Sequence, residues 1–287
     1  MFCNDIPQPL FLIISKITPH LLYYSHIPSA IIALILGLFV YFKTNKENNS
    51  LGSKLLLFIG LSFFLWAFLD LIIWTNIDSR RIMFSWSIVN LIEMLVTSST
   101  LYFSYVFLEN KDAPLKFKLF IGSLLLIFAA LIPTKLNIPY FNISTCEAEQ
   151  GPLIYYFYSL EILFIVILAI YLVGRIIKAD KAERGLTTLF SAGVIFFVAS
   201  FSGANIAGSL TDKWTILQYG LFGMPVFMAL LAYLIVQYKI FNVRLLAAQV
   251  SAVATVVLIG SQFFFIQNNT NRLLTAITLV LVAVFGW

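Results

Sequence analysis

The chain has 287 residues, of which 61% are apolar and only 11% charged, and its mean hydropathy is +0.95. Soluble domains have about 45–50% apolar and about 25% charged residues, so the composition excludes an ordinary soluble protein. A closed β-barrel is also excluded, because its strands are ~10 residues long and alternate in polarity, whereas these apolar segments run for the ~20 residues that a membrane-crossing helix needs. The net charge of +5 comes from short basic stretches between these segments, which indicate topology and not nucleic-acid binding.

Taken in chain order, nine apolar segments are predicted to cross the membrane as helices with short connections. They are residues 21–42, 55–74, 82–108, 117–132, 153–177, 187–210, 217–238, 246–266 and 273–287. The predicted fold class is therefore an all-α polytopic transmembrane helical bundle of about nine spans. Residues 1–20 are predicted to be an interfacial leader, because prolines interrupt this apolar stretch and it lacks the features of a signal peptide.

The positions of lysine and arginine predict the orientation. With the N-terminus outside, twelve of the eighteen basic residues lie on the cytoplasmic face, which fits the positive-inside rule and places the C-terminus in the cytoplasm. Cys3 and Cys146 then both lie outside, where a disulfide between them or two free thiols are the alternatives. No phosphate-binding loop, metal-protease motif or serine-hydrolase motif is present in the sequence, so neither a metal, a cofactor nor soluble-type catalysis is predicted.

Ionisable and polar residues inside the predicted spans are the candidate functional groups, because each is costly to insert into lipid. Asp70 has a tryptophan four residues to either side, on the same helix face. Segment 82–108 carries a polar stripe at spacings of three and four, which includes Thr97, Thr100 and Ser104. The alternative is that these groups only hydrogen-bond between helices and hold the bundle together. The candidate ligand-binding residues are Asp70, Glu93, Trp66, Trp74, Trp86, Asn90, Glu161, Asn205 and His26.

Residues 232–245, with the sequence AYLIVQYKIFNVRL, resemble the junction that follows the seventh helix in the N-terminal seven-transmembrane region of bacterial sensor histidine kinases. Residues 142–152, which include Cys146 and Gly151, are similar to the outer loop between helices four and five of that family. The sequence departs from the family pattern in having Asn242 where an aspartate is usual and Gln237 where a lysine often stands.

This resemblance implies a seven-transmembrane sensor module over 21–240 and two further transmembrane helices over 241–287. The last of these helices ends without a basic stop, as expected if the sequence is cut before a cytoplasmic kinase domain. The expected function is detection of an unknown small-molecule or lipid signal in a bacterial plasma membrane, by a homodimer that passes the signal to a kinase domain and a response regulator. The implied signal-transmitting junction is Tyr238, Lys239, Phe241, Asn242 and Arg244. The alternative is a secondary transporter or channel in which Asp70 and Glu93 couple ions or protons.

Overall fold

The structure is a computed structural model that describes residues 21–43, 51–76, 78–144, 147–211 and 213–238, together with residues 260, 273, 276 and 277. Several of the sequence predictions lie outside the described residues. They are the leader 1–20, most of the spans 246–266 and 273–287, both cysteines, and junction residues Lys239, Phe241, Asn242 and Arg244.

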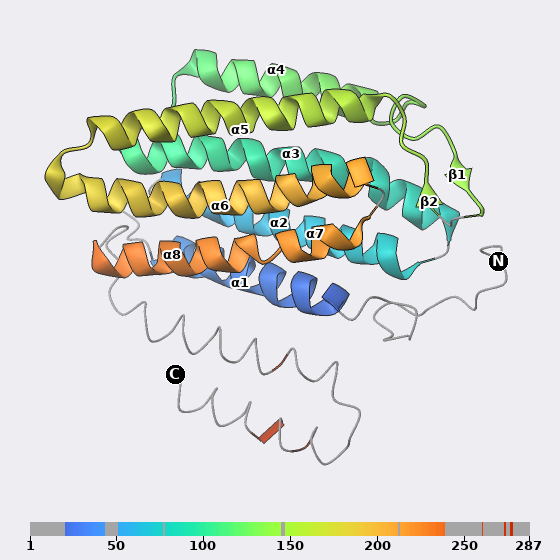
Figure 1. Cartoon of the computed structure of the whole chain (residues 1–287), viewed down its shortest axis with the longest axis horizontal. Helices are drawn as coiled ribbons and strands as arrows, with labels where there is room; N and C mark the ends of the chain where they lie inside the picture. The colour runs from blue at the N-terminus through green and yellow to red at the C-terminus, as the bar shows by residue number, and fades with distance from the viewer. Residues whose placement is uncertain are drawn as a thin grey trace. The chain divides into compact units, whose positions relative to one another are not determined.

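The described residues form helices and one short hairpin (Figure 1). The helices are α1 (Leu21–Lys43), α2 (Leu51–Thr75), α3 (Ser79–Glu109), α4 (Leu115–Leu131), α5 (Leu153–Lys178), α6 (Lys181–Thr211), α7 (Thr215–Gly220) and α8 (Gly223–Gln237). Strands β1 (Phe141–Asn142) and β2 (Glu147–Ala148) pair antiparallel, with Phe141 opposite Ala148.

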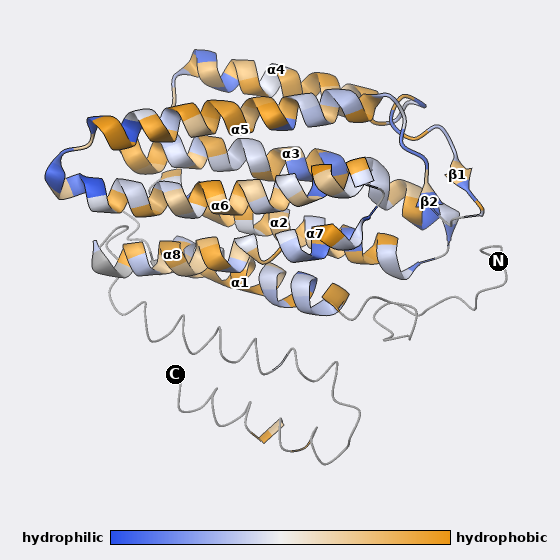
Figure 2. Ribbon diagram, viewed as in Figure 1, coloured by the Kyte–Doolittle hydropathy of each residue, from blue (hydrophilic) through white to orange (hydrophobic). Residues whose placement is uncertain are grey.

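Among the residues that the structure describes, six helical segments are long and apolar enough to cross a membrane. Figure 2 shows apolar residues along most of the length of the helices, and hydrophilic residues at the turn between α5 and α6. The all-α class and the multi-pass membrane character predicted from the sequence are therefore confirmed. The six segments are Leu21–Phe42, Leu51–Thr75, Ser79–Glu109, Leu153–Lys178, Lys181–Thr211 and Thr215–Ile235.

One predicted span is short for a membrane crossing, and another is divided in two. The predicted fourth span is α4, a helix of 17 residues; at ~1.5 Å per residue it reaches ~25 Å, less than the ~30 Å hydrocarbon layer. The predicted seventh span is interrupted at Leu221–Phe222 and forms α7 and α8. Pro225 explains the interruption, because it has no N–H to donate to the carbonyl of Leu221, which accepts from the N–H of Met224 at 3.3 Å instead.

The chain divides into two compact units, and α2 and α5 contribute to both. The first unit contains Ser62–Leu172, which includes α3, α4 and the hairpin. In this unit α4 buries only Ile121 and Phe128, and the ring of Phe128 stacks on that of Tyr156 from α5 with centroids 6.4 Å apart. The hydroxyl of Tyr156 donates to the carbonyl of Leu124 at 3.3 Å. Since its other apolar side chains are half-buried or exposed, α4 has a composition suited to contact with lipid.

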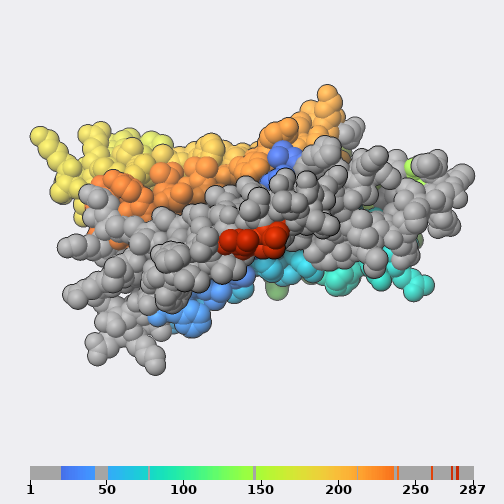
Figure 3. Space-filling view, turned by 90° about the horizontal axis from the view of Figure 1, so that it is seen from below, coloured from blue at the N-terminus to red at the C-terminus, as the bar shows by residue number. Residues whose placement is uncertain are grey.

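The second unit contains α1, the part of α2 through Leu61, and the chain from Val173 through α6, α7 and α8. The rings of Phe197 on α6 and Phe227 on α8 stack with centroids 5.5 Å apart and 10° between their planes. In the space-filling view of Figure 3, the orange atoms of α8 lie against the yellow atoms of α6. Within the second unit, α6, α7 and α8 therefore form one closely packed group.

Candidate functional site

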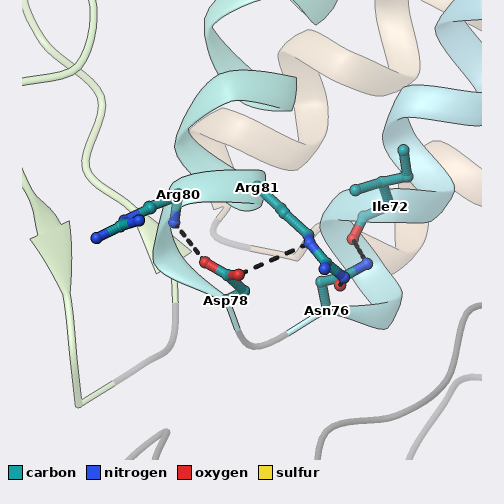
Figure 4. Close-up of polar contacts among 5 residues, drawn as sticks. All are labelled: Ile72, Asn76, Asp78, Arg80 and Arg81. Carbon is teal, nitrogen blue, oxygen red and sulfur yellow. Dashed lines mark hydrogen bonds and ion pairs between the residues drawn. The ribbon is translucent and has the colours of Figure 1, made fainter.

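The turn between α2 and α3 positions the candidate site in the first unit (Figure 4). Asp78 is the N-cap of α3, and its side chain accepts a hydrogen bond from the backbone N–H of Arg80 at 2.9 Å. The guanidinium of Arg81 lies 3.6 Å from the Asp78 carboxylate and 3.4 Å from the Asn76 side-chain oxygen. The Asn76 amide donates to the carbonyl of Ile72 at 3.1 Å, so polar groups of α2 and α3 are joined across the turn. A capped, short turn of this kind fixes two antiparallel helices in register.

A hydrogen bond between Trp66 and Glu93 joins α2 to α3 at the centre of the candidate site. The indole N–H of Trp66 donates to Oε2 of Glu93 at 3.0 Å, and each residue is only 1% exposed. The indole ring also stacks on Phe63, with centroids 6.4 Å apart. A buried carboxylate is costly to desolvate, so a donor of fixed orientation stabilises it where it lies. The structure thus brings together two of the residues predicted from the sequence.

The register of α2 against α3 places two more candidates beside this pair. Since the helices are antiparallel, a residue seven positions after Trp66 should lie level with one seven positions before Glu93. These residues are Ile73 and Trp86, and both pack against one apolar cluster, which agrees with this register. Asp70, one turn after Trp66, then lies level with Asn90, one turn before Glu93. Asp70 and Asn90 are buried, with 7% and 8% exposure.

The remainder of the polar stripe on α3 is satisfied within its own helix. The hydroxyls of Thr97, Thr100 and Ser104 donate to the carbonyls of Glu93, Val96 and Thr100 at 3.2, 2.8 and 2.8 Å. This is the usual i−4 bond of hydroxyl residues inside helices, and it needs no second helix and no ligand. The stripe therefore has two parts: Glu93 bonds a neighbouring helix, as the structural alternative expects, while the hydroxyls beyond it bond within α3.

The loop between α4 and α5 covers the Trp86 end of α3, a contact that sequence reasoning missed. The side-chain amide of Asn137 donates to the carbonyls of Ser87 and Ile132 at 3.4 and 3.2 Å. Gly151 donates its N–H to the Asn137 carbonyl at 2.7 Å, and a Cβ at Gly151 would lie 2.2 Å from the Leu136 carbonyl oxygen. The sequence signal was Gly151 itself, because a glycine is required where two backbones approach this closely.

The apolar face of the same loop packs on α3 beside the candidate site. Ile138 and Ala148 from the loop are buried against Ile82, and Trp86 and Phe141 pack on that cluster. Trp86 therefore contacts the loop, and the next two helical turns of α3 carry Asn90 and Glu93. A displacement of the loop would act directly on the helix that carries Glu93.

The other end of the first unit carries a surface cluster of opposite charges. The ammonium of Lys118 lies 2.7 Å from the Asp112 carboxylate, and the hydroxyl of Tyr102 donates to the other oxygen of that carboxylate. The hydrogen bond from Lys118, followed by that from Tyr102, lowers the pKa of Asp112. The hydroxyl of Tyr171 on α5 donates to Glu109 at 3.3 Å. These contacts join the end of α3 to α4 and α5, so their role is to hold the three helices together.

The remaining candidates lie elsewhere in the two units. In the first unit, Glu161 on α5 is fully buried and Trp74 on α2 is half-buried. In the second unit, His26 is fully buried on α1, and its Nδ1 lies 2.7 Å from the carbonyl of Leu22. A carbonyl can only accept, so Nδ1 carries the proton in this contact. Asn205 on α6 is buried, with 6% exposure.

These observations define a multi-pass α-helical membrane protein whose first unit holds a buried carboxylate in a bond between two helices. In the described part of the chain, Asp70, Glu93 and Glu161 are buried, and no lysine or arginine is. A ligand that took the indole bond from Glu93, or a proton added to that carboxylate, would change the strength of the α2–α3 contact. Comparison with models of known protein families, with characterised proteins and with solved structures gave no match.

Proposed function

We propose that the chain is the membrane input module of a bacterial sensor histidine kinase, with the N-terminus outside, about nine spans and the C-terminus in the cytoplasm. The observation that carries this proposal is the buried Trp66–Glu93 hydrogen bond at 3.0 Å. A sensor must have an element whose packing differs between two states, and a signal must interact unequally with them. A buried polar bond between two helices is an element of this kind, because it can be broken without unfolding either helix.

The position of the Trp66–Glu93 bond supports the proposal that a signal reaches it from outside the membrane. In the proposed orientation the loop 132–152 faces outward, and it packs on Trp86 at the end of α3 nearest to Glu93. A signal that reached the loop or entered beside α2 and α3 would alter the environment of Glu93. The residues that we assign to the sensing site are Trp66, Asp70, Trp86, Asn90 and Glu93.

The test compares phosphorylation in membranes that carry the natural gene product. The gene is translated past codon 287, and label transfer from ATP is measured for the unmodified protein, for Glu93→Gln and for the control Glu183→Gln. Glu183 is exposed in the first turn of α6, so the same substitution there alters no buried bond. We expect Glu93→Gln to change the phosphorylated fraction several-fold at equal membrane levels and Glu183→Gln to leave it unchanged. A continuation without an ATP-binding domain, or equal phosphorylation in all three proteins, would contradict the proposal.

A secondary transporter is the second candidate, and the interruption between α7 and α8 favours it. Transporters place discontinuous helices at their substrate sites, and the segment Thr215–Ile235 is interrupted inside an apolar run. Proteoliposomes separate the two functions. A transporter would acidify or alkalise the lumen when an ion gradient is imposed, and Glu93→Gln would abolish this flux, whereas a sensor would show no flux with or without the substitution.

A further inference from the structure

The interruption between α7 and α8 lies close against Ser200 of α6, with Ala204 and Phe197 beside it. Gly220 ends α7 and Gly223 begins α8. A Cβ at Gly220 would lie 2.3 Å from the backbone oxygen of Ser200, and a Cβ at Gly223 would lie 1.8 Å from the Ser200 hydroxyl oxygen. Real Cβ atoms essentially never approach this closely. Gly220 would meet backbone and the Ala204 Cβ at 2.4 Å, so this position requires glycine, whereas at Gly223 the Ser200 hydroxyl would have to rotate away before alanine could fit. Ser200 therefore fits into a gap that exists only because glycines flank the interruption.

The Ser200 side chain is itself fixed in direction. Its hydroxyl donates to the carbonyl of Phe197 at 3.0 Å, within α6. This bond holds the oxygen in one rotamer, toward Gly223, because a hydroxyl bonded to its own helix turn loses its freedom about χ1. Phe197 in turn stacks on Phe227 of α8 at 5.5 Å. The Ser200–Gly223 contact and the Phe197–Phe227 stack therefore both hold α6 in the same alignment with α8.

Other glycines extend this close contact in both directions along α6. A Cβ at Gly193 would lie 3.1 Å from Leu230, and one at Gly208 would lie 3.3 Å from Trp214. At the end of α8, the hydroxyl of Tyr238 lies 3.2 Å from the Cβ position of Gly185. Close approach of helices through small residues is a main source of packing energy in membranes, where lipid removes most of the hydrophobic driving force.

We propose that Ser200, held between Gly220 and Gly223, fixes the register of α6 against α7 and α8, so that the three helices move as one rigid body. A slip of one residue along the helix axis, about 1.5 Å, would force the Ser200 side chain into backbone. The rigid group ends at Tyr238, the first residue of the predicted signal-transmitting junction. The direction in which a signal passes through this group rests on the proposed sensor function, but the rigidity does not.

The test measures distances between spin labels by pulsed electron paramagnetic resonance in lipid nanodiscs. The full chain carries Cys3→Ser and Cys146→Ser, and labels are attached at Phe196→Cys on α6 and Val226→Cys on α8, whose native side chains are 50% and 42% exposed. We expect one narrow distribution for the otherwise unmodified chain. If this chain, without a substitution at the contact, already gives a broad or double distribution, the proposal is overturned. Neither outcome depends on a kinase or a ligand, so this experiment does not test the sensor proposal.

Substitutions at the contact then test the role of Ser200. Gly223→Ala should shift the mean distance by about 1.5 Å or broaden the distribution, while Gly203→Ala, which has nothing within 4 Å of its Cβ position, should leave it unchanged. Adding Ser200→Ala to Gly223→Ala removes the atom at 1.8 Å and should restore the narrow distribution. The same addition should not rescue Gly220→Ala, which meets the Ser200 backbone. A narrow, unshifted distribution for Gly223→Ala, or equal rescue of both variants, would overturn the proposal.

Discussion

The strength of the Trp66–Glu93 bond can be measured with a double-mutant cycle. Trp66→Phe removes the indole donor and keeps an aromatic ring beside Phe63, and Glu93→Met removes the acceptor while it keeps a side chain of similar length. Hydrogen bonds between membrane helices contribute about 0.6 kcal/mol on average and up to about 1.7 kcal/mol. Because Glu93 is a carboxylate that is only 1% exposed, we expect a coupling free energy near the upper end, about 1–2 kcal/mol.

The assay is the free energy of unfolding in bicelles, measured by steric trapping for the parent chain, the two single variants and the double variant. The control cycle pairs Glu93→Met with Trp86→Phe, the same aromatic substitution two turns away on α3. Sites more than about 7–10 Å apart normally add to within about 0.5 kcal/mol, so the control coupling should be near zero. Equal coupling in the two cycles would refute the reasoning, because it would mean that the Trp66 donor has no particular role at Glu93.

Two further predictions concern the loop and the surface cluster of the first unit. Gly151→Ala should lower the free energy of unfolding by about 1–3 kcal/mol, because its Cβ would lie 2.2 Å from the Leu136 carbonyl oxygen. The control Gly122→Ala has nothing within 4 Å of its Cβ position and should not destabilise the chain. Thermal unfolding in detergent compares the two variants, and equal unfolding midpoints would contradict the prediction. The lowered pKa of Asp112 means that its bond with Lys118 stabilises the fold above the unfolded-state pKa and is lost as the pH falls through the lower folded-state value. Asp112→Asn should therefore lower the unfolding midpoint at neutral pH and converge with the parent chain in acid, and a difference that grows toward low pH would show that the sign is wrong.

The helical segments were predictable because their cause is local. Each predicted span from 21–42 to 187–210 corresponds to a helix whose ends lie within a few residues of the prediction, except that α6 begins earlier, at Lys181. The length of apolar sequence decides whether a segment becomes a membrane helix, and that length is visible in the chain. The interruption of the seventh segment was visible only as Pro225, since proline occurs in continuous membrane helices as well as in broken ones.

The candidate site was predicted only in part, because helix spacing shows which residues share a face and not what that face contacts. The spacing of Trp86, Asn90 and Glu93 predicts one face of α3, on which Asn90 and Glu93 are buried and Trp86 is half-buried. The same pattern gave no means to separate Glu93, which bonds Trp66, from Thr100, which bonds its own helix. A hydroxyl can reach the carbonyl four residues back, whereas a carboxylate cannot donate to it and must find a donor elsewhere.

The sequence by itself determined that this chain is a bundle of membrane helices, because hydropathy and segment length follow from residue type alone. Only the tertiary structure decided which helices carry the polar bond, that a loop covers the Trp86 end of α3, and that Ser200 lies between two glycines at a helix interruption. These features depend on distances between residues far apart in the chain. Such distances are set by the packing of whole helices, in which a single methyl group at Gly151 or Gly220 would not fit.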